Sequence, residues 1–149
     1  MKAQPLQAPP GAGTELEIAL AAVRHWLGGR RPRLALVLGS GLGGCTGLLV
    51  DPDRIPYRDI PGFPLPTTEG HGGEFLVGSL GGRETLVQSG RFHGYEGRGD
   101  AGAILPVRLF GGLGVTHLAL TNAAGGIRPT LQPGALMLIA DQINFTFRS

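Results

Sequence analysis

Apolar residues recur at helical spacing near the start of the chain. Thr14 and Glu17 have the spacing of a capping box, and Gly28 follows the last apolar position as a helix terminator. The pattern therefore predicts a helix over residues 14–27. The apolar positions on its inner face are Leu16, Ala19, Leu20, Val23 and Leu27.

Five short apolar runs predict strands, at residues 33–38, 74–80, 84–89, 115–121 and 135–139. The first run is short and continuous, as in a strand that is buried on both faces. Gly81 and Gly82 separate the second run from the third, which is the signature of a two-residue hairpin. The set therefore contains both an antiparallel hairpin and strands that need longer connections.

The remaining segments divide into one helix and one irregular stretch. Asp100 is a suitable cap for a helix that reaches about Leu113, and Pro106 means that this helix either begins at the proline or is kinked there. Residues 51–70 are rich in proline, and we expect them to be irregular. Strands joined partly through helices and partly by a hairpin predict an α/β fold, with a mixed central sheet flanked by helices.

Composition predicts one domain and excludes several classes of partner. The chain has 149 residues and 42% hydrophobic content, which suits a single domain over residues 14–149 behind a flexible tail at residues 1–13. A net charge of +2 without a basic run gives no reason to expect nucleic acid or a membrane surface. Cys45 is the only cysteine, which excludes an internal disulfide and a cysteine-cluster metal site. No run has the length of a signal peptide or a membrane span, so we expect a cytoplasmic protein.

Three predicted strands end in glycine-rich segments, at residues 39–44, 90–97 and 121–126. Such loops bring backbone N–H groups close to an anion, and small side chains leave room for a flat ligand. Ser40 lies in the first loop, where it either presents its hydroxyl to a ligand or caps the next short helix. If the three strands are neighbours, their exits converge on one site.

The second glycine-rich segment, residues 90–97, carries the side chains with the most distinctive chemistry. If it stays extended, Arg91, His93 and Tyr95 lie on one side and Phe92 on the other. A guanidinium offers paired donors to phosphate, an imidazole can add a hydrogen bond or a proton, and a phenol ring can lie along a sugar. The segment is either an anion site with an organic neighbour or a solvated strand end.

The first glycine loop also matches the dinucleotide fingerprint G-x-G-x-x-G through Gly39, Gly41 and Gly44. That fingerprint should open a long helix and precede an acid at the end of a second strand. Here Pro52 falls early and Asp59 lies in turn-like sequence. The interpretation as a dinucleotide-binding domain therefore rests only on the glycine spacing.

Four motifs resemble, in the same order, the successive signatures of the trimeric purine nucleoside phosphorylases. They are Leu-Gly-Ser-Gly-Leu-Gly at 38–43, Glu-Gly-His-Gly-Gly at 69–73, Gly-Arg-Phe-His-Gly-Tyr-Glu-Gly at 90–97 and Thr-Asn-Ala-Ala-Gly-Gly at 121–126. The resemblance runs from about Thr14 to Ser149 and also includes Pro106-Val107-Arg108 and Asp141-Gln142-Ile143-Asn144.

This resemblance implies an enzyme that cleaves the N-glycosidic bond of purine ribonucleosides or deoxyribonucleosides with inorganic phosphate. The products are the free purine base and ribose or deoxyribose 1-phosphate, and phosphate is a co-substrate with no metal or organic cofactor. It also implies a homotrimer. The implied catalytic residues are His93 and Arg91. The implied phosphate ligands are Ser40, His71, Arg91, Phe92, His93 and Ala123, and the implied nucleoside contacts are Tyr95, Ala123, Ala124 and Gly125.

The resemblance covers only the amino-terminal portion of the family. The later half of the family's sequence, with side chains that hold the purine, has no counterpart here, so we expect a sheet that is incomplete at its carboxyl end. Residues 98–100 also depart from an aromatic-proline pair that is common in the family. One alternative is an inactive phosphate-binding or assembly fragment. Another is a methylthioadenosine phosphorylase, although the segment 122–124 and Tyr95 fit the 6-oxopurine class better.

Overall fold

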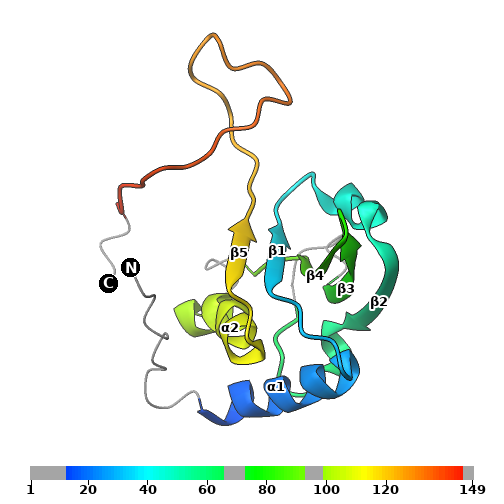
Figure 1. Cartoon of the computed structure of the whole chain (residues 1–149). Helices are drawn as coiled ribbons and strands as arrows, with labels where there is room; N and C mark the ends of the chain where they lie inside the picture. The colour runs from blue at the N-terminus through cyan, green and yellow to red at the C-terminus, as the bar shows by residue number, and fades with distance from the viewer. Residues whose placement is uncertain (1–12, 66–72, 93–98, 146–149) are drawn as a thin grey trace.

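The computed structural model describes residues 13–65, 73–92 and 99–145, and within them five strands form one mixed sheet in the order β2-β3-β4-β1-β5 (Figure 1). The strands are β1 (Leu34–Leu38), β2 (Val50–Pro56), β3 (Glu74–Leu80), β4 (Arg83–Ser89) and β5 (His117–Leu120). The helices are α1 (Gly13–Leu27) and α2 (Gly99–Leu113), with short 3-10 helices η1 (Gly43–Leu48) and η2 (Tyr57–Asp59). The predicted α/β fold with a mixed sheet is confirmed.

Alternation along β1 separates the two faces of the sheet. Ala35 and Val37 join the larger core, which contains the inner faces of α1 and α2. Leu36 and Leu38 join a smaller cluster that includes Cys45 from η1. Because successive side chains of a strand point to opposite faces, both long helices cover one face and η1 covers the other. Burial on both faces explains the continuous apolar run of β1.

The two helices are in direct contact at Gly112. A Cβ atom at this position would lie 2.7 Å from the Cδ atoms of Leu20 in α1, so glycine permits the close approach. Arg24 of α1 donates a hydrogen bond to the Gly112 carbonyl at 2.6 Å. The predicted first helix is confirmed, and it ends at Leu27, directly before Gly28, which has a φ of +60°. The second helix runs through Pro106 instead of beginning there.

The segment 51–70 was expected to be irregular, and its first part is instead the edge strand β2. This strand pairs antiparallel with β3, and a register shift between Val50 and Asp53 spans Pro52. Pro56 lies at the end of the strand. An edge strand tolerates proline because one of its sides needs no backbone donor. The last residues of the predicted irregular segment lie outside the described part of the chain.

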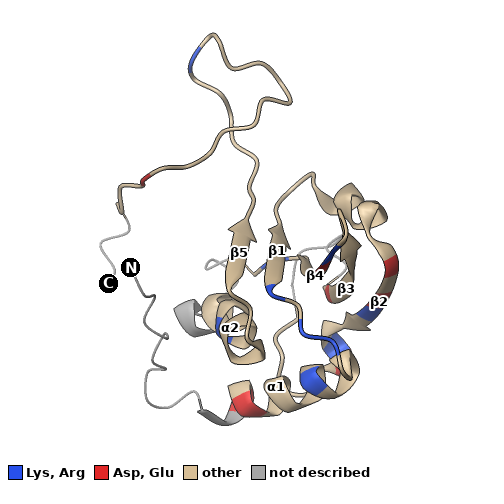
Figure 2. Ribbon diagram, in the orientation of Figure 1, with Lys and Arg blue, Asp and Glu red and all other residues tan. Residues whose placement is uncertain are grey.

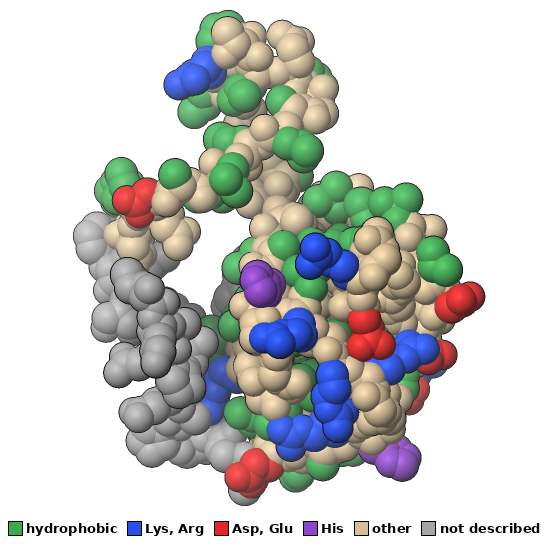
Figure 3. Space-filling view, in the orientation of Figure 1, with side chains coloured by type: hydrophobic (Ala, Val, Ile, Leu, Met, Phe, Trp, Pro, Cys, Tyr) green, Lys and Arg blue, Asp and Glu red, His purple; other side chains and the backbone are tan. Residues whose placement is uncertain are grey.

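The strand expected at residues 135–139 is absent, because residues 121–145 form neither helix nor strand. After β5 this segment runs away from the sheet (Figure 1), so its backbone has no neighbouring strand to pair with. The apolar side chains that suggested a strand are exposed along it (Figure 3). The strand predicted at residues 115–121 is present but shorter, as β5.

Candidate functional site

The strands β4, β1 and β5 lie side by side and run parallel. Val37 of β1 pairs with Leu120 of β5, and Leu38 of β1 pairs with Ser89 of β4. The three carboxyl ends therefore meet at one edge of the sheet, which is where open α/β sheets bind their ligands. The convergence of the exits that lead to Ser40, Arg91 and Ala123 is present in the structure.

Gly39 and Thr121 join the ends of β1 and β5. The Gly39 N–H donates to the Thr121 hydroxyl at 2.9 Å, and this hydroxyl donates to the Val37 carbonyl at 2.8 Å. A Cβ atom at residue 39 would lie 2.4 Å from the Thr121 carbonyl oxygen, so only glycine fits without movement. The Gly39 N–H therefore already has a hydrogen-bond acceptor within the protein. The glycine loop cannot offer this donor to a ligand unless the Thr121 contact breaks.

Ser40 lies exposed at the tip of a tight turn. The Leu42 N–H donates to the Gly39 carbonyl at 3.1 Å, and Gly41 has the positive φ (+81°) that a type II turn requires at its third residue. Leu42, with no side-chain cap, precedes η1. Ser40 is thus not a helix cap, and its hydroxyl remains a candidate ligand contact. The short η1 also lacks the long helix that the dinucleotide fingerprint requires.

Arg91 follows β4 and reaches toward the end of β5. Its side chain is half-buried, and its Nη1 donates to the Thr121 carbonyl oxygen across a long 3.4 Å contact. Its Nε is buried and has no hydrogen-bond partner among the residues that the structure describes. A buried donor of a charged group without an acceptor is costly, and such groups occur where a ligand or ion supplies the acceptor. Arg91 is therefore the strongest anion-binding candidate at this edge.

Phe92 points away from this edge, as the predicted alternation requires. Its ring is buried and lies 5.5 Å from the Tyr57 ring and 5.8 Å from the Phe63 ring, measured between ring centroids. The side chain of Phe92 therefore belongs to the core. Any phosphate contact made by this residue must come from its backbone.

Two buried polar side chains that contact Gly90, the residue before Arg91, were not predicted from the sequence. The Tyr57 hydroxyl donates to the Gly90 carbonyl at 2.7 Å, and the Gln88 amide donates to the same oxygen at 3.3 Å. Burial raises the pKa of Tyr57 far above its ordinary value, so this phenol stays neutral and acts as a donor. An amide at the end of the apolar run of β4 was the available sequence signal for Gln88.

Part of the predicted site lies outside the described residues, namely His71, His93 and Tyr95. Ala123, Ala124 and Gly125 are described and follow β5 in an exposed segment. The structure brings Ser40, Arg91 and the start of this segment to one edge through strand pairing. The residues that the structure describes do not form a closed purine slot.

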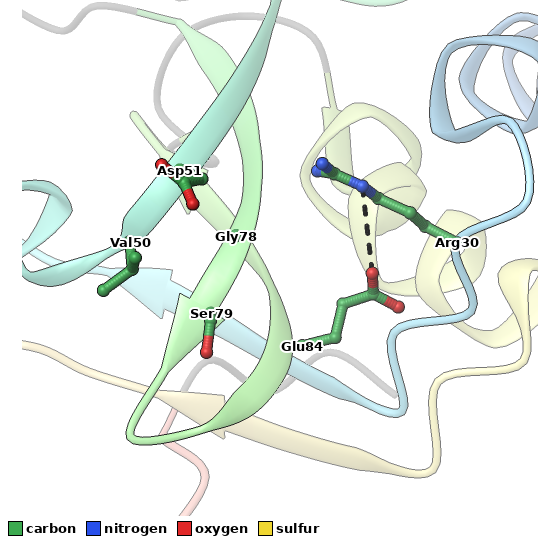
Figure 4. A pocket seen from close by; sticks show the side chains of 6 residues that line it. All are labelled: Arg30, Val50, Asp51, Gly78, Ser79 and Glu84. Carbon is green, nitrogen blue, oxygen red and sulfur yellow. Dashed lines mark ion pairs between the residues drawn. The ribbon is translucent and has the colours of Figure 1, made fainter.

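Two hollows lie at the opposite end of the sheet from this edge. One, of about 310 Å³, is lined by Arg30, Val50, Asp51, Gly78, Ser79 and Glu84 (Figure 4). The guanidinium of Arg30 is paired there with Asp53 at 3.1 Å and with Glu84 at 3.9 Å. The other, of about 330 Å³, lies where α1 and α2 end, and its lining includes Arg24, Arg30 and Arg31. Basic residues occur along the end of α1 and the connection from α1 to β1 (Figure 2). Because the charge of Arg30 is already neutralised, the first hollow is a poor anion site.

The described residues contain neither a metal-binding cluster nor a membrane-spanning helix. They contain no group of three or more His, Cys, Asp or Glu side chains arranged to hold a metal ion. None of their helices has the length and apolar character that crossing a membrane requires.

Comparison with known proteins connects the sequence and the fold to one family. Residues 33–149 match the model of the phosphorylase superfamily. Purine nucleoside phosphorylase of Rattus norvegicus is 47% identical over 114 residues, which are 76% of this chain and 39% of the rat protein. Purine nucleoside phosphorylase 1 of Geobacillus stearothermophilus is 47% identical over 113 residues, which are 76% of this chain and 41% of that protein.

Solved structures that are similar to this chain are also purine nucleoside phosphorylases. Purine nucleoside phosphorylase of Schistosoma mansoni, in complex with acetate, superposes with a TM-score of 0.72 at 36% identity, over 80% of this chain and 44% of that chain. A purine nucleoside phosphorylase in complex with ribose-1-phosphate gives a TM-score of 0.73 at 35% identity, over 85% of this chain and 46% of that one. The chain spans about two-fifths of the length of the curated relatives described above.

Proposed function

The chain belongs to the phosphorylase superfamily, and from this membership we propose that it provides the phosphate-binding part of a purine nucleoside phosphorylase. The proposed reaction is cleavage of the bond between a purine and ribose or deoxyribose by inorganic phosphate. A phosphate oxygen forms the new bond to the anomeric carbon, and the bond to the base nitrogen breaks. The products are the free base, which takes up a proton, and the sugar 1-phosphate. The proposal needs no organic cofactor or metal.

The observation that carries the proposal is the buried Nε of Arg91, which has no hydrogen-bond partner in the described part of the chain, at the edge where β4, β1 and β5 end. Glycosidic cleavage passes through an oxocarbenium-like sugar, so the protein must hold the anionic nucleophile beneath the sugar carbon. A planar guanidinium suits this task because its donors match the spacing of phosphate oxygens.

The roles of the other residues follow from position and from the resemblance. Ser40 supplies a hydroxyl from the β1 exit, and the backbone N–H of Ala123 supplies a donor from the β5 exit. The resemblance adds His71 and His93 to the phosphate site, with His93 and Arg91 as the catalytic pair, and the backbone of Phe92 as a further contact. It places Tyr95 against the sugar and Ala123, Ala124 and Gly125 beside the purine. The proposed working form is a cytoplasmic homotrimer that takes part in purine salvage.

Titration of the purified chain with inorganic phosphate tests this proposal. Arg91→Ala should weaken phosphate binding, because a charge-assisted hydrogen bond contributes about 1.5 to 3 kcal/mol, or roughly 10- to 150-fold in Kd. Arg83→Ala is the matched control. It removes the same charge from the exposed beginning of β4, at the other end of the strand that leads to Arg91.

Both binding and turnover need to be measured. A folded chain that shows no phosphate binding, or equal losses in the two arginine variants, would refute the phosphate site. Phosphate-dependent loss of inosine, with formation of ribose 1-phosphate, supports the full reaction. Phosphate binding without any turnover of inosine supports the phosphate site alone and favours the inactive phosphate-binding fragment.

A further inference from the structure

Tyr57 lies behind the proposed phosphate site and is fully buried. Its hydroxyl donates to the Gly90 carbonyl oxygen at 2.7 Å, and the Gln88 amide donates to the same oxygen at 3.3 Å. Both donors are almost inaccessible to water, at 0% and 2% exposure. Hydrogen bonds between buried groups are costly to break, because the freed partner has no water to replace the lost contact.

The accepting carbonyl belongs to the peptide that carries Arg91. Because a peptide unit is planar, the Gly90 C=O and the Arg91 N–H share one plane. Gly90 also has a φ of +92°, a conformation that glycine adopts freely and that therefore has little intrinsic rigidity. Holding the Gly90 carbonyl fixes the plane from which the Arg91 side chain departs.

The ring of Tyr57 also contacts the residue on the other side of Arg91. It lies 5.5 Å from the Phe92 ring and 5.0 Å from the Phe75 ring, measured between centroids. Its own backbone N–H donates to the Gly73 carbonyl at 2.7 Å, which fixes the position of the residue itself. Tyr57 therefore contacts the residues immediately before and after Arg91, through its hydroxyl and its ring respectively.

We propose that Tyr57, assisted by Gln88, is a positioning residue that aims the Arg91 guanidinium at the phosphate site. The inference rests on the proposed function for its ligand, but its structural part concerns Arg91 alone. Tyr57 does not touch the ligand. It acts by restricting the turn at Gly90, so that the half-buried guanidinium of Arg91 reaches the Thr121 carbonyl oxygen and keeps its Nε facing the site.

The test compares Tyr57→Phe, which removes only the hydroxyl, with Thr85→Val as a matched control. Thr85 is also fully buried, and its hydroxyl bonds to the Arg83 carbonyl at 3.0 Å, at the start of β4. Calorimetric titration with inorganic phosphate should show a roughly 3- to 10-fold higher Kd for Tyr57→Phe and less than a 2-fold change for Thr85→Val. Gln88→Met, which removes the second donor, provides an independent variant if Tyr57→Phe does not fold.

A second measurement separates this inference from the proposed function. The Nε–H signal of Arg91 in a nitrogen-15 NMR spectrum, assigned by its loss in Arg91→Ala, should shift or broaden in Tyr57→Phe and stay unchanged in Thr85→Val. That result without phosphate binding by the wild-type chain would refute the phosphate site and support the positioning role. An unchanged Arg91 signal in folded Tyr57→Phe or Gln88→Met would overturn the positioning role, even if the wild-type chain binds phosphate.

Discussion

The hydroxyl of Thr121 accepts a hydrogen bond from the backbone N–H of Gly39 at 2.9 Å and donates one to the Val37 carbonyl at 2.8 Å. This single oxygen therefore connects the end of β5 to the end of β1. A buried amide and a carbonyl both depend on it, at the edge where the proposed ligand binds.

Thr121→Val keeps the shape of the side chain and removes this oxygen. We expect the free energy of unfolding to fall by about 1 to 3 kcal/mol, because the Gly39 amide loses its acceptor. Urea denaturation followed by circular dichroism measures the change. Thr121→Ser, which keeps the hydroxyl, should lose less than half as much, and equal losses in the two variants would contradict this account.

Gly39→Ala should destabilise the chain, because the added Cβ atom would lie 2.4 Å from the Thr121 carbonyl oxygen. Overpacking of this kind costs about 1 to 3 kcal/mol. Gly43→Ala is the control, since a Cβ atom there meets nothing within 4 Å. Thermal unfolding should separate the two variants by several degrees. Matching melting temperatures would show that β1 and β5 can move apart freely.

Ser40→Ala should weaken phosphate binding less than Arg91→Ala. A hydrogen bond from a neutral hydroxyl contributes about 0.5 to 1.5 kcal/mol, against about 1.5 to 3 kcal/mol for one that involves a charged group. Calorimetric titration of both variants with inorganic phosphate gives the order. The reverse order would place the anion at the exposed turn of Ser40 and away from the half-buried guanidinium.

The stability of the chain should fall at high pH in a way that depends on Tyr57. In an unfolded chain the phenol ionises near pH 10, whereas burial holds its pKa well above that value in the folded state. Above about pH 10 the unfolded state alone releases this proton, so unfolding becomes easier by up to about 1.4 kcal/mol per pH unit. Tyr57→Phe should lack this component.

Urea denaturation between pH 8 and about pH 11 tests the expectation, because other titrating groups act equally in both chains. The wild-type chain should lose more stability than Tyr57→Phe as the pH rises. Parallel curves would show that the Tyr57 phenol can ionise in the folded protein without disrupting its contact with Gly90.

Local patterns predicted most of the fold, and the failures have a common cause. The helix that ends before Gly28 and the hairpin through Gly81 and Gly82 depend on neighbouring residues, so the sequence contains their signals. The edge strand β2 was missed because Pro52 is compatible with a strand only at an edge or a bulge. The run at residues 135–139 has strand composition, yet a strand also needs a partner, which composition does not specify.

The site was predicted in the same uneven way. Arg91 was identified from its residue type and its place after a strand. Its buried Nε, which has no partner among residues 13–65, 73–92 and 99–145, adds support. The contact between Thr121 and Gly39 was missed because it joins residues 82 positions apart in the chain. Tyr57 was missed for a similar reason. It lies in a proline-rich segment, and only the folded chain brings its hydroxyl to Gly90.

The position of β1 between β4 and β5 limits how far the length of this strand can change. Since β1 pairs with β4 on one side and β5 on the other, inserting one residue into it would move Ser40 along the strand by about 3.3 Å relative to both neighbours. It would also exchange the two faces of the strand from that point onward. Substitutions in the three loops can therefore retune the chemistry of the edge, whereas a change in the length of β1 would disrupt the spacing and the core together.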